Sequence, residues 1–129
     1  MAEASKTVVV MGTMDTKGPE LAYLARQVAS AGCRALLMDV GAAAESNTEA
    51  DITAAQVAAA NGEDIEKIRA LPRGEAVEKM VATAAAYLQH MVRSGEAHGV
   101  IGVGGSGGTT ICAAAMRALP YGVPKFMVS

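Results

Sequence analysis

A glycine-rich stretch with hydroxyl side chains is the part of this sequence best suited to ligand binding. This glycine loop spans residues 102–110 and reads Gly-Val-Gly-Gly-Ser-Gly-Gly-Thr-Thr, after an apolar run that begins near Gly99. Glycine loses more conformational entropy on folding than any other residue, so this density indicates a backbone that approaches a ligand closely. A strand, a glycine loop and a helix N-terminus in succession aim N–H groups and the positive helix end at an anion, which predicts a phosphate or nucleotide site. A tight strand-to-helix turn with close packing is the alternative.

A second polar loop, residues 12–20, carries side chains that suit the same chemistry. This lysine loop follows the β-branched run 7–12 and holds two threonines, one aspartate and one lysine between its glycines. Its Lys17 precedes Gly18, whereas a P-loop needs lysine directly after the second glycine. The loop is therefore not a P-loop, and it is either a second part of the anion site or an ordinary polar surface loop.

The elements that must position these loops alternate between strands and helices. A continuous apolar, β-branched run is typical of a buried parallel strand, and apolar residues three and four apart indicate a helix. The expected strands are 7–12, 34–41, 99–103 and one from 125 onward. The expected helices are 19–31, 54–60 with a Thr53–Gln56 capping box, 74–94 and one after the glycine loop. Residues 41–53 are expected to be irregular, and 63–73 to form a loop or one short turn.

This alternation predicts an α/β fold, a Rossmann-like parallel sheet flanked by helices with right-handed crossovers. Open α/β sheets bind ligands at the carboxyl edge of their strands, so we expect the two loops to converge on one ligand. Asp39 ends the second strand, 21 residues after Gly18. In dinucleotide folds an acid at this distance takes a ribose hydroxyl, and a strand-end cap or turn residue is the alternative.

The composition describes one domain with an aliphatic core. The 129 residues are 51% hydrophobic but only 3% aromatic, and they contain no tryptophan. Single-stranded nucleic-acid binding needs aromatic platforms and a basic groove, and a net charge of −2 with a pI near 5.6 indicates neither. We therefore expect no nucleic-acid partner.

The two cysteines and the polar N-terminus predict a cytoplasmic protein. Cys33 and Cys112 make neither a disulfide framework nor a metal knuckle, and they read as small buried residues of a reducing compartment. No signal peptide precedes the first strand, and no apolar run reaches the length of a membrane span. We expect no membrane partner.

The strand that begins at Lys125 is apolar and is expected to be central, yet the sequence stops at Ser129. We therefore interpret residues 1–129 as the N-terminal part of a Rossmann-like nucleotide-binding domain, truncated at its C-terminus. An uncovered strand exposes apolar surface and an open sheet edge, which invite association. The chain is expected to form a homo-oligomer or to need the rest of its own protein.

Five motifs in matching order also carry a family resemblance. They lie at residues 12–21, 39–41, 73–76, 102–109 and 116–125. Together they resemble the Tm-1-like ATP-binding proteins, a family named for a plant resistance protein against tomato mosaic virus and made up mostly of uncharacterised microbial members. The resemblance covers essentially the whole chain, and it implies a Rossmann-like N-terminal domain that binds ATP.

The resemblance also implies roles for the residues of both loops. Phosphate would be held by backbone N–H groups and hydroxyls of Gly104, Gly105, Ser106, Gly107, Gly108, Thr109 and Thr110. The lysine loop would contribute Gly12, Thr13, Lys17 and Gly18. Asp15 would hold Mg²⁺ through water, since magnesium keeps several of its waters. Asp39 would take the ribose, and Arg73 would reach phosphate unless it forms a surface ion pair.

Three functions compete at this stage. The leading hypothesis is a nucleotide-binding part of a longer protein. Its rival is a phosphotransferase or a hydrolase of a phosphorylated metabolite, with Asp15 as base and Lys17 on the transferred phosphate. A third is a protein-interaction module with purely structural glycines, which the hydroxyls on both loops disfavour. The residues do not separate the first hypothesis from the second, and no catalytic residue is assigned.

Overall fold

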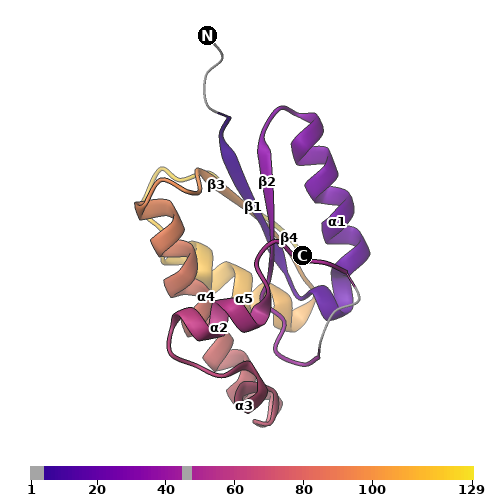
Figure 1. The fold of residues 1–129 in the computed structure, drawn as a ribbon, viewed down its shortest axis with the longest axis vertical. Helices are drawn as coiled ribbons and strands as arrows, with labels where there is room; N and C mark the ends of the chain where they lie inside the picture. The colour runs from indigo at the N-terminus through magenta and orange to yellow at the C-terminus, as the bar shows by residue number, and fades with distance from the viewer. Residues whose placement is uncertain (1–4, 45–47) are drawn as a thin grey trace.

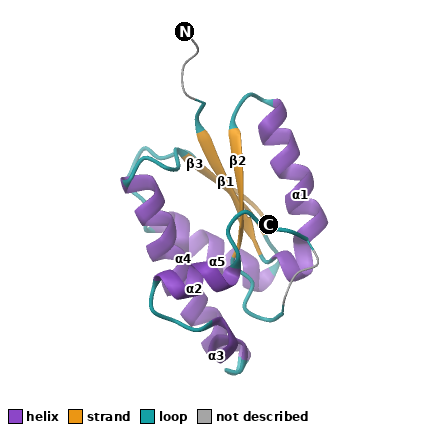
Figure 2. Cartoon of the chain, viewed as in Figure 1, coloured by secondary structure: helices purple, strands orange, loops and turns teal. Residues whose placement is uncertain are grey.

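The apolar runs form one parallel sheet in a computed structural model that describes residues 5–44 and 48–129 (Figure 2). Its strands are β1 (Thr7–Gly12), β2 (Arg34–Asp39), β3 (Gly99–Val103) and β4 (Lys125–Val128), in the spatial order β2-β1-β3-β4. The predicted α/β, Rossmann-like architecture is thereby confirmed. Only the second strand was predicted too long, by two residues.

Helices cover both faces of the sheet (Figure 1). α1 (Met14–Ser30) lies on one face, while α4 (Arg73–Arg93) and α5 (Ser106–Arg117) lie on the other, with α2 (Ala54–Ala60) and α3 (Ile65–Arg69) beside them. The apolar side chains of β1 explain this layering. Val10 packs with α1, whereas Val9 and Met11 pack into the larger core on the opposite face. Both faces of β1 are buried, which is why its sequence is continuously apolar.

The start of the first helix differs from the prediction. α1 begins at Met14, five residues before Pro19, and its backbone leaves the helical conformation at Lys17 (φ −122°, ψ 20°). Pro19 has no N–H to donate to the preceding turn, and proline disfavours helical geometry in the residue before it. The prediction identified the helix behind Pro19 and missed the extra turn, 14–16, that precedes the kink. As a result Asp15 and Lys17 belong to a helical N-terminus and not to an irregular loop.

The remaining helices agree closely with the sequence. α2 has the predicted capping box, in which Thr53 Oγ1 accepts from the Gln56 N–H and Gln56 Oε1 accepts from the Thr53 N–H. α4 is displaced by one residue from the predicted 74–94. Residues 65–69, expected to be a loop or a short turn, form α3 behind an Asp64 cap. Of the irregular segment 41–53, residues 45–47 lie outside the described part of the chain, as do residues 1–4.

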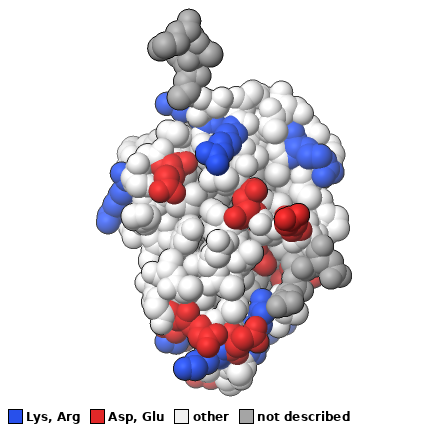
Figure 3. All heavy atoms as spheres, in the orientation of Figure 1, with Lys and Arg blue, Asp and Glu red and all other residues white. Residues whose placement is uncertain are grey.

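Charged side chains of both signs are interspersed on the face in Figure 3, and they are most crowded at the end formed by α3. Among the described residues, no helix combines the length and the apolarity that a bilayer span requires.

The β4 strand, expected to be central, is an edge strand of this sheet. Phe126 and Val128 pair in register with Ile101 and Val103, which pack on the α1 side. α1 covers mainly β1 and β2, so Phe126 remains 65% exposed and Val128 44% exposed. These four residues form an apolar stripe that water contacts.

We expect this stripe to make the 129-residue chain self-associate, because exposed apolar area at a sheet edge favours contact with a second copy. Light scattering over a range of concentrations should show larger species for the unmodified chain. Replacing Phe126 and Val128 by threonine, which keeps the strand propensity, should reduce the amount of these larger species. A monomer at every concentration would contradict the expectation.

Candidate functional site

One cavity lies at the carboxyl edge of the sheet, where β1, β2 and β3 end beside one another. Its volume is about 540 Å³, and it is lined by the first turns of α1, α4 and α5 and by Ala42 and Ala43 after β2. The lysine loop and the glycine loop, distant in sequence, therefore face the same space, as expected from their positions at the carboxyl edge of the sheet. Thr13 shows how close they are, since its Oγ1 would lie 3.3 Å from a Cβ atom added at Gly108.

The glycines of the glycine loop are not all explained by the same structural requirement. A Cβ at Gly104 would lie 2.6 Å from backbone atoms of Gly108 and Thr109, so this glycine is required by the tight turn. Among the described residues, a Cβ at Gly105 would meet no atom within 4 Å, and one at Gly107 would meet only Arg73 Nη2 at 3.8 Å. None of the five glycines of this loop has a positive φ, so none is needed for a left-handed conformation. The packing of the described residues therefore does not explain Gly105 and Gly107, which both line the cavity.

Three helix N-termini converge on this cavity, and none is capped by the side chain of its own N-cap residue. These N-cap residues are Thr13 for α1, Pro72 for α4 and Gly105 for α5. By contrast, the first residues of α2 and α3 do not line the cavity, and these helices are capped by Thr53 and Asp64. The positive ends of three helix dipoles therefore point to one region, which favours an anion there.

The hydroxyl groups of the two loops divide between the cavity and the backbone. Thr13, Thr16 and Ser106 line the cavity, and the Thr13 and Thr16 hydroxyls share a 2.7 Å hydrogen bond. Thr109 and Thr110 do not line it. Their hydroxyls donate to the carbonyls of Gly104 and Ser106, at 3.0 Å each, because α5 already begins at Ser106 and places Thr110 beyond its first turn.

Asp15 presents an unusual carboxylate to the cavity. Its Oδ1 is buried, and within the described part of the chain this oxygen has no hydrogen-bond partner. A buried polar atom without a partner costs free energy, which makes it a candidate for contact with a ligand or cation. No group of three or more His, Cys, Asp or Glu side chains suited to a metal occurs among residues 5–44 and 48–129.

Asp39 lies behind this cavity and does not line it. Its Oδ1 accepts hydrogen bonds from the Gly41 N–H at 2.8 Å and the Met14 N–H at 3.1 Å. Burial raises the pKa of the Asp39 carboxyl, the two backbone donors oppose that increase, and the charge of Asp15 adds to it. The geometry corresponds to the strand-end cap that the sequence analysis left open, and the ribose role stays a prediction.

Three cationic side chains, Lys17, Arg69 and Arg73, line the cavity. Lys17 and Arg73 were predicted, whereas Arg69 was missed because residues 63–73 were expected to form a charged loop or one short turn. The spacing of Ile65 and Ile68 behind Asp64 is the signal that could have revealed α3. Arg69 Nη1 also forms a 3.0 Å ion pair with Glu66 Oε1.

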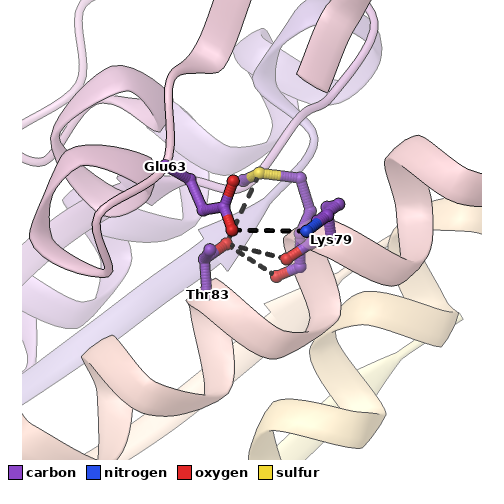
Figure 4. Close-up of polar contacts among 4 residues, drawn as sticks. Glu63, Lys79 and Thr83 are labelled. Carbon is purple, nitrogen blue, oxygen red and sulfur yellow. Dashed lines mark hydrogen bonds and ion pairs between the residues drawn. The ribbon is translucent and has the colours of Figure 1, made fainter. Parts of the chain in front are cut away.

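The segment that carries Arg69 and Arg73 is tied to the body of α4. Lys79 Nζ of α4 lies 3.4 Å from Glu63 Oε1, just before α3, whereas the Thr83 hydroxyl donates to the carbonyls of Lys79 and Met80 within α4 itself (Figure 4). The ion pair is largely exposed and contributes little by itself. Ile65 and Ile68, both buried in the core, supply most of the attachment of α3.

The rest of the cavity wall is aliphatic, and none of its residues was predicted as a site residue. It consists of Ala42, Ala43, Leu71, Ala76, Val77 and Ile111. The predicted residues Gly12 and Gly18 lie outside the lining. A Cβ at Gly12 would lie 2.5 Å from the Val103 carbonyl oxygen, so close packing of β1 explains that glycine.

The parallel sheet, its strand order and the cavity at its carboxyl edge define an α/β domain of Rossmann-like architecture. Within that class the chain belongs to the uncharacterised protein family UPF0261, whose N-terminal domain matches residues 6–129.

Relatives in bacteria and a plant support this assignment. A UPF0261 protein of Clostridium tetani is 37% identical over 97% of this chain and 31% of its own length, and one of Rhizobium meliloti is 42% identical over 96% and 30%. The tomato protein named ToMV susceptible protein tm-1(GCR26) is 30% identical over 97% of this chain and 19% of its own. The resemblance to the Tm-1-like family is thus confirmed, and the chain spans about 30% of the length of the bacterial relatives.

Proposed function

We propose that this domain binds a nucleotide, ATP, in the cavity at the carboxyl edge of the sheet, as the N-terminal part of a longer protein. The observation that carries the proposal is the open space over Gly105 and Gly107. Neither glycine is required by φ or by the packing of the described residues, and both belong to an uncapped helix N-terminus. Close approach of a phosphate to the backbone is the physical reason that remains for them.

The charges and the shape of the cavity support the same ligand. Lys17, Arg69 and Arg73 line the cavity beside Asp15, the one acid in its lining, so the lining is cationic even though Arg69 also pairs with Glu66. The remaining lining residues are aliphatic and suit the faces of a nucleobase. The volume of about 540 Å³ is within the range of small-molecule sites.

Asp15 fits the magnesium ion that usually accompanies ATP. Its buried Oδ1 is a hard oxygen ligand with no hydrogen-bond partner among the described residues. Magnesium is commonly held by one or two carboxylates, phosphate oxygens and water, so a cluster of protein ligands is not needed. When bound, the ion would neutralise phosphate charge beside this acid.

The buried Oδ1 of Asp15 is also compatible with the rival hypothesis, a phosphotransferase or hydrolase. As a buried carboxylate without a hydrogen-bond partner in the described residues, Asp15 would also suit the base of a phosphotransferase or hydrolase. Release of phosphate or ADP from ATP by the full-length protein, lost in Asp15→Asn, would favour that activity over binding alone.

We also propose a cytoplasmic location. Cys33 and Cys112 are both free thiols, and burial raises the pKa of Cys112 to about 12, so it remains protonated. Unpaired cysteines are typical of reducing compartments.

Thermal unfolding of the full-length protein with ATP, adenosine and tripolyphosphate, each with and without Mg²⁺, tests the proposed function. ATP at 100 times its dissociation constant should stabilise the domain that binds it by about 2.7 kcal/mol. We expect ATP with Mg²⁺ to raise the melting temperature most and adenosine least. No shift with any phosphate ligand, confirmed by calorimetry, would reject the proposal.

A further inference from the structure

Asp39 connects two segments that contribute to the cavity lining, the start of α1 and the turn after β2. One carboxylate oxygen, Oδ1, accepts from Met14, the first residue of α1, and from Gly41, which follows β2. The side chain is almost fully buried, with 6% of its residue surface exposed. A single buried acceptor therefore sets the separation between the start of α1 and the turn that leads to Ala42 and Ala43.

Gly41 connects this acceptor to Asp15. A Cβ at residue 41 would lie 2.6 Å from Asp15 Oδ1 and 3.1 Å from Asp39 Oδ1. The two carboxylates thus approach Gly41 from the same side, and Asp15 occupies the space that a larger residue would fill. Asp15 can keep this position only while Gly41 and the first turn of α1 stay where Asp39 holds them.

We propose that Asp39 is a positioning residue, which clamps the α1 N-terminus and the turn after β2 so that Asp15 and the lysine loop face the bound phosphates. This inference rests on the proposed function. It differs from a ribose contact, because Oδ1 already has two backbone donors and Asp39 is absent from the cavity lining.

The surroundings of Asp39 predict how the difference in folding stability between the wild type and Asp39→Asn changes with pH. Asp15 on α1 and Arg69 on α3 are the charged groups that act on Asp39, and burial has the largest effect, so the folded-state pKa lies above the ordinary value. Ionisation therefore costs more in the folded than in the unfolded chain, and the cost grows as pH rises from the ordinary pKa of about 4 to the raised folded-state pKa. Relative to Asp39→Asn, the wild type should lose stability over that range of pH and show no further loss above it.

Calorimetric titration of the full-length protein with ATP and with tripolyphosphate tests the clamp. Asp39→Ala removes the acceptor and should lower the affinities for both ligands about tenfold or more. Asp39→Asn keeps an oxygen that can accept both N–H bonds and should restore both affinities to within about threefold. The matched control is Asp51→Ala, since Asp51 Oδ2 accepts the Leu37 N–H of the same strand at 2.8 Å but does not line the cavity. Its affinities should not change.

Amide hydrogen exchange separates the clamp from the ligand. Exchange at Met14 and Gly41 should be faster in Asp39→Ala than in Asp39→Asn, with or without nucleotide. Unchanged exchange, or unchanged affinity in Asp39→Ala, would overturn the positioning role. A loss of ATP but not tripolyphosphate affinity in Asp39→Asn would show a ribose contact instead. If the wild type binds neither ligand, the proposed function is wrong. Faster exchange in Asp39→Ala would then show that Asp39 holds the two segments together for the stability of the fold and not for ligand binding.

Discussion

Gly107→Val should abolish ATP binding while the domain remains folded. Gly107 is the second residue of α5 and lines the cavity, and a Cβ there would have only Arg73 Nη2, at 3.8 Å, within 4 Å among residues 5–44 and 48–129. A branched side chain would occupy the path of a phosphate toward the N–H groups of the helix N-terminus. Because valine replaces glycine within a helix and meets no backbone, we expect stability to change by less than about 1 kcal/mol.

Calorimetry should show an affinity loss of at least about 100-fold for ATP, with an unchanged thermal transition in the absence of ligand. Gly74→Val is the matched control, because a Cβ at Gly74 also meets open space but Gly74 does not line the cavity. Gly104→Val should behave in the opposite way and destabilise by about 1–3 kcal/mol, since its Cβ would lie 2.6 Å from backbone atoms. Unchanged affinity in a folded Gly107→Val protein would exclude the phosphate from α5.

Arg73→Ala should lower the affinity for ATP by about 10- to 100-fold and leave the affinity for adenosine unchanged. Arg73 is the first residue of α4, and its Nη2 lies 3.8 Å from the position that a Cβ of Gly107 would take. Its guanidinium is thus beside the helix N-terminus proposed to hold phosphate. A hydrogen bond to a charged group is worth about 1.5–3 kcal/mol, and arginine suits phosphate through paired donors.

Titrations with ATP, ADP and adenosine would measure this dependence on phosphate. Arg73→Lys should recover part of the affinity, because it keeps the charge but not the forked geometry. Arg93→Ala, at the other end of α4, is the control and should have no effect. Lys17→Ala should act in the same direction as Arg73→Ala. Equal losses for ATP and adenosine would mean that Arg73 does not contact phosphate.

The sequence alone predicted most of the fold because the relevant signals are local. β1, buried on both faces, has a continuous apolar run, and α2 begins at a capping box that four consecutive residues complete. The long helix was predicted to within one residue at each end from its apolar spacing. Strand–helix alternation then made a parallel sheet the expected arrangement, and the carboxyl-edge rule brought the two loops to one side of it.

Which glycines face a ligand and which acids face the cavity were decided only by tertiary structure. In the sequence, Gly104 and Gly107 are equivalent members of one loop, yet backbone packing requires the first while open space surrounds the second. Asp15 and Asp39 likewise read as two candidate ligand contacts, but one lines the cavity and the other binds backbone N–H groups behind it. Arg69 and most of the aliphatic wall lie outside the recognised motifs. Such roles depend on distances between atoms far apart in the chain, which periodicity and capping patterns do not encode, because those patterns report only on neighbours within a few residues.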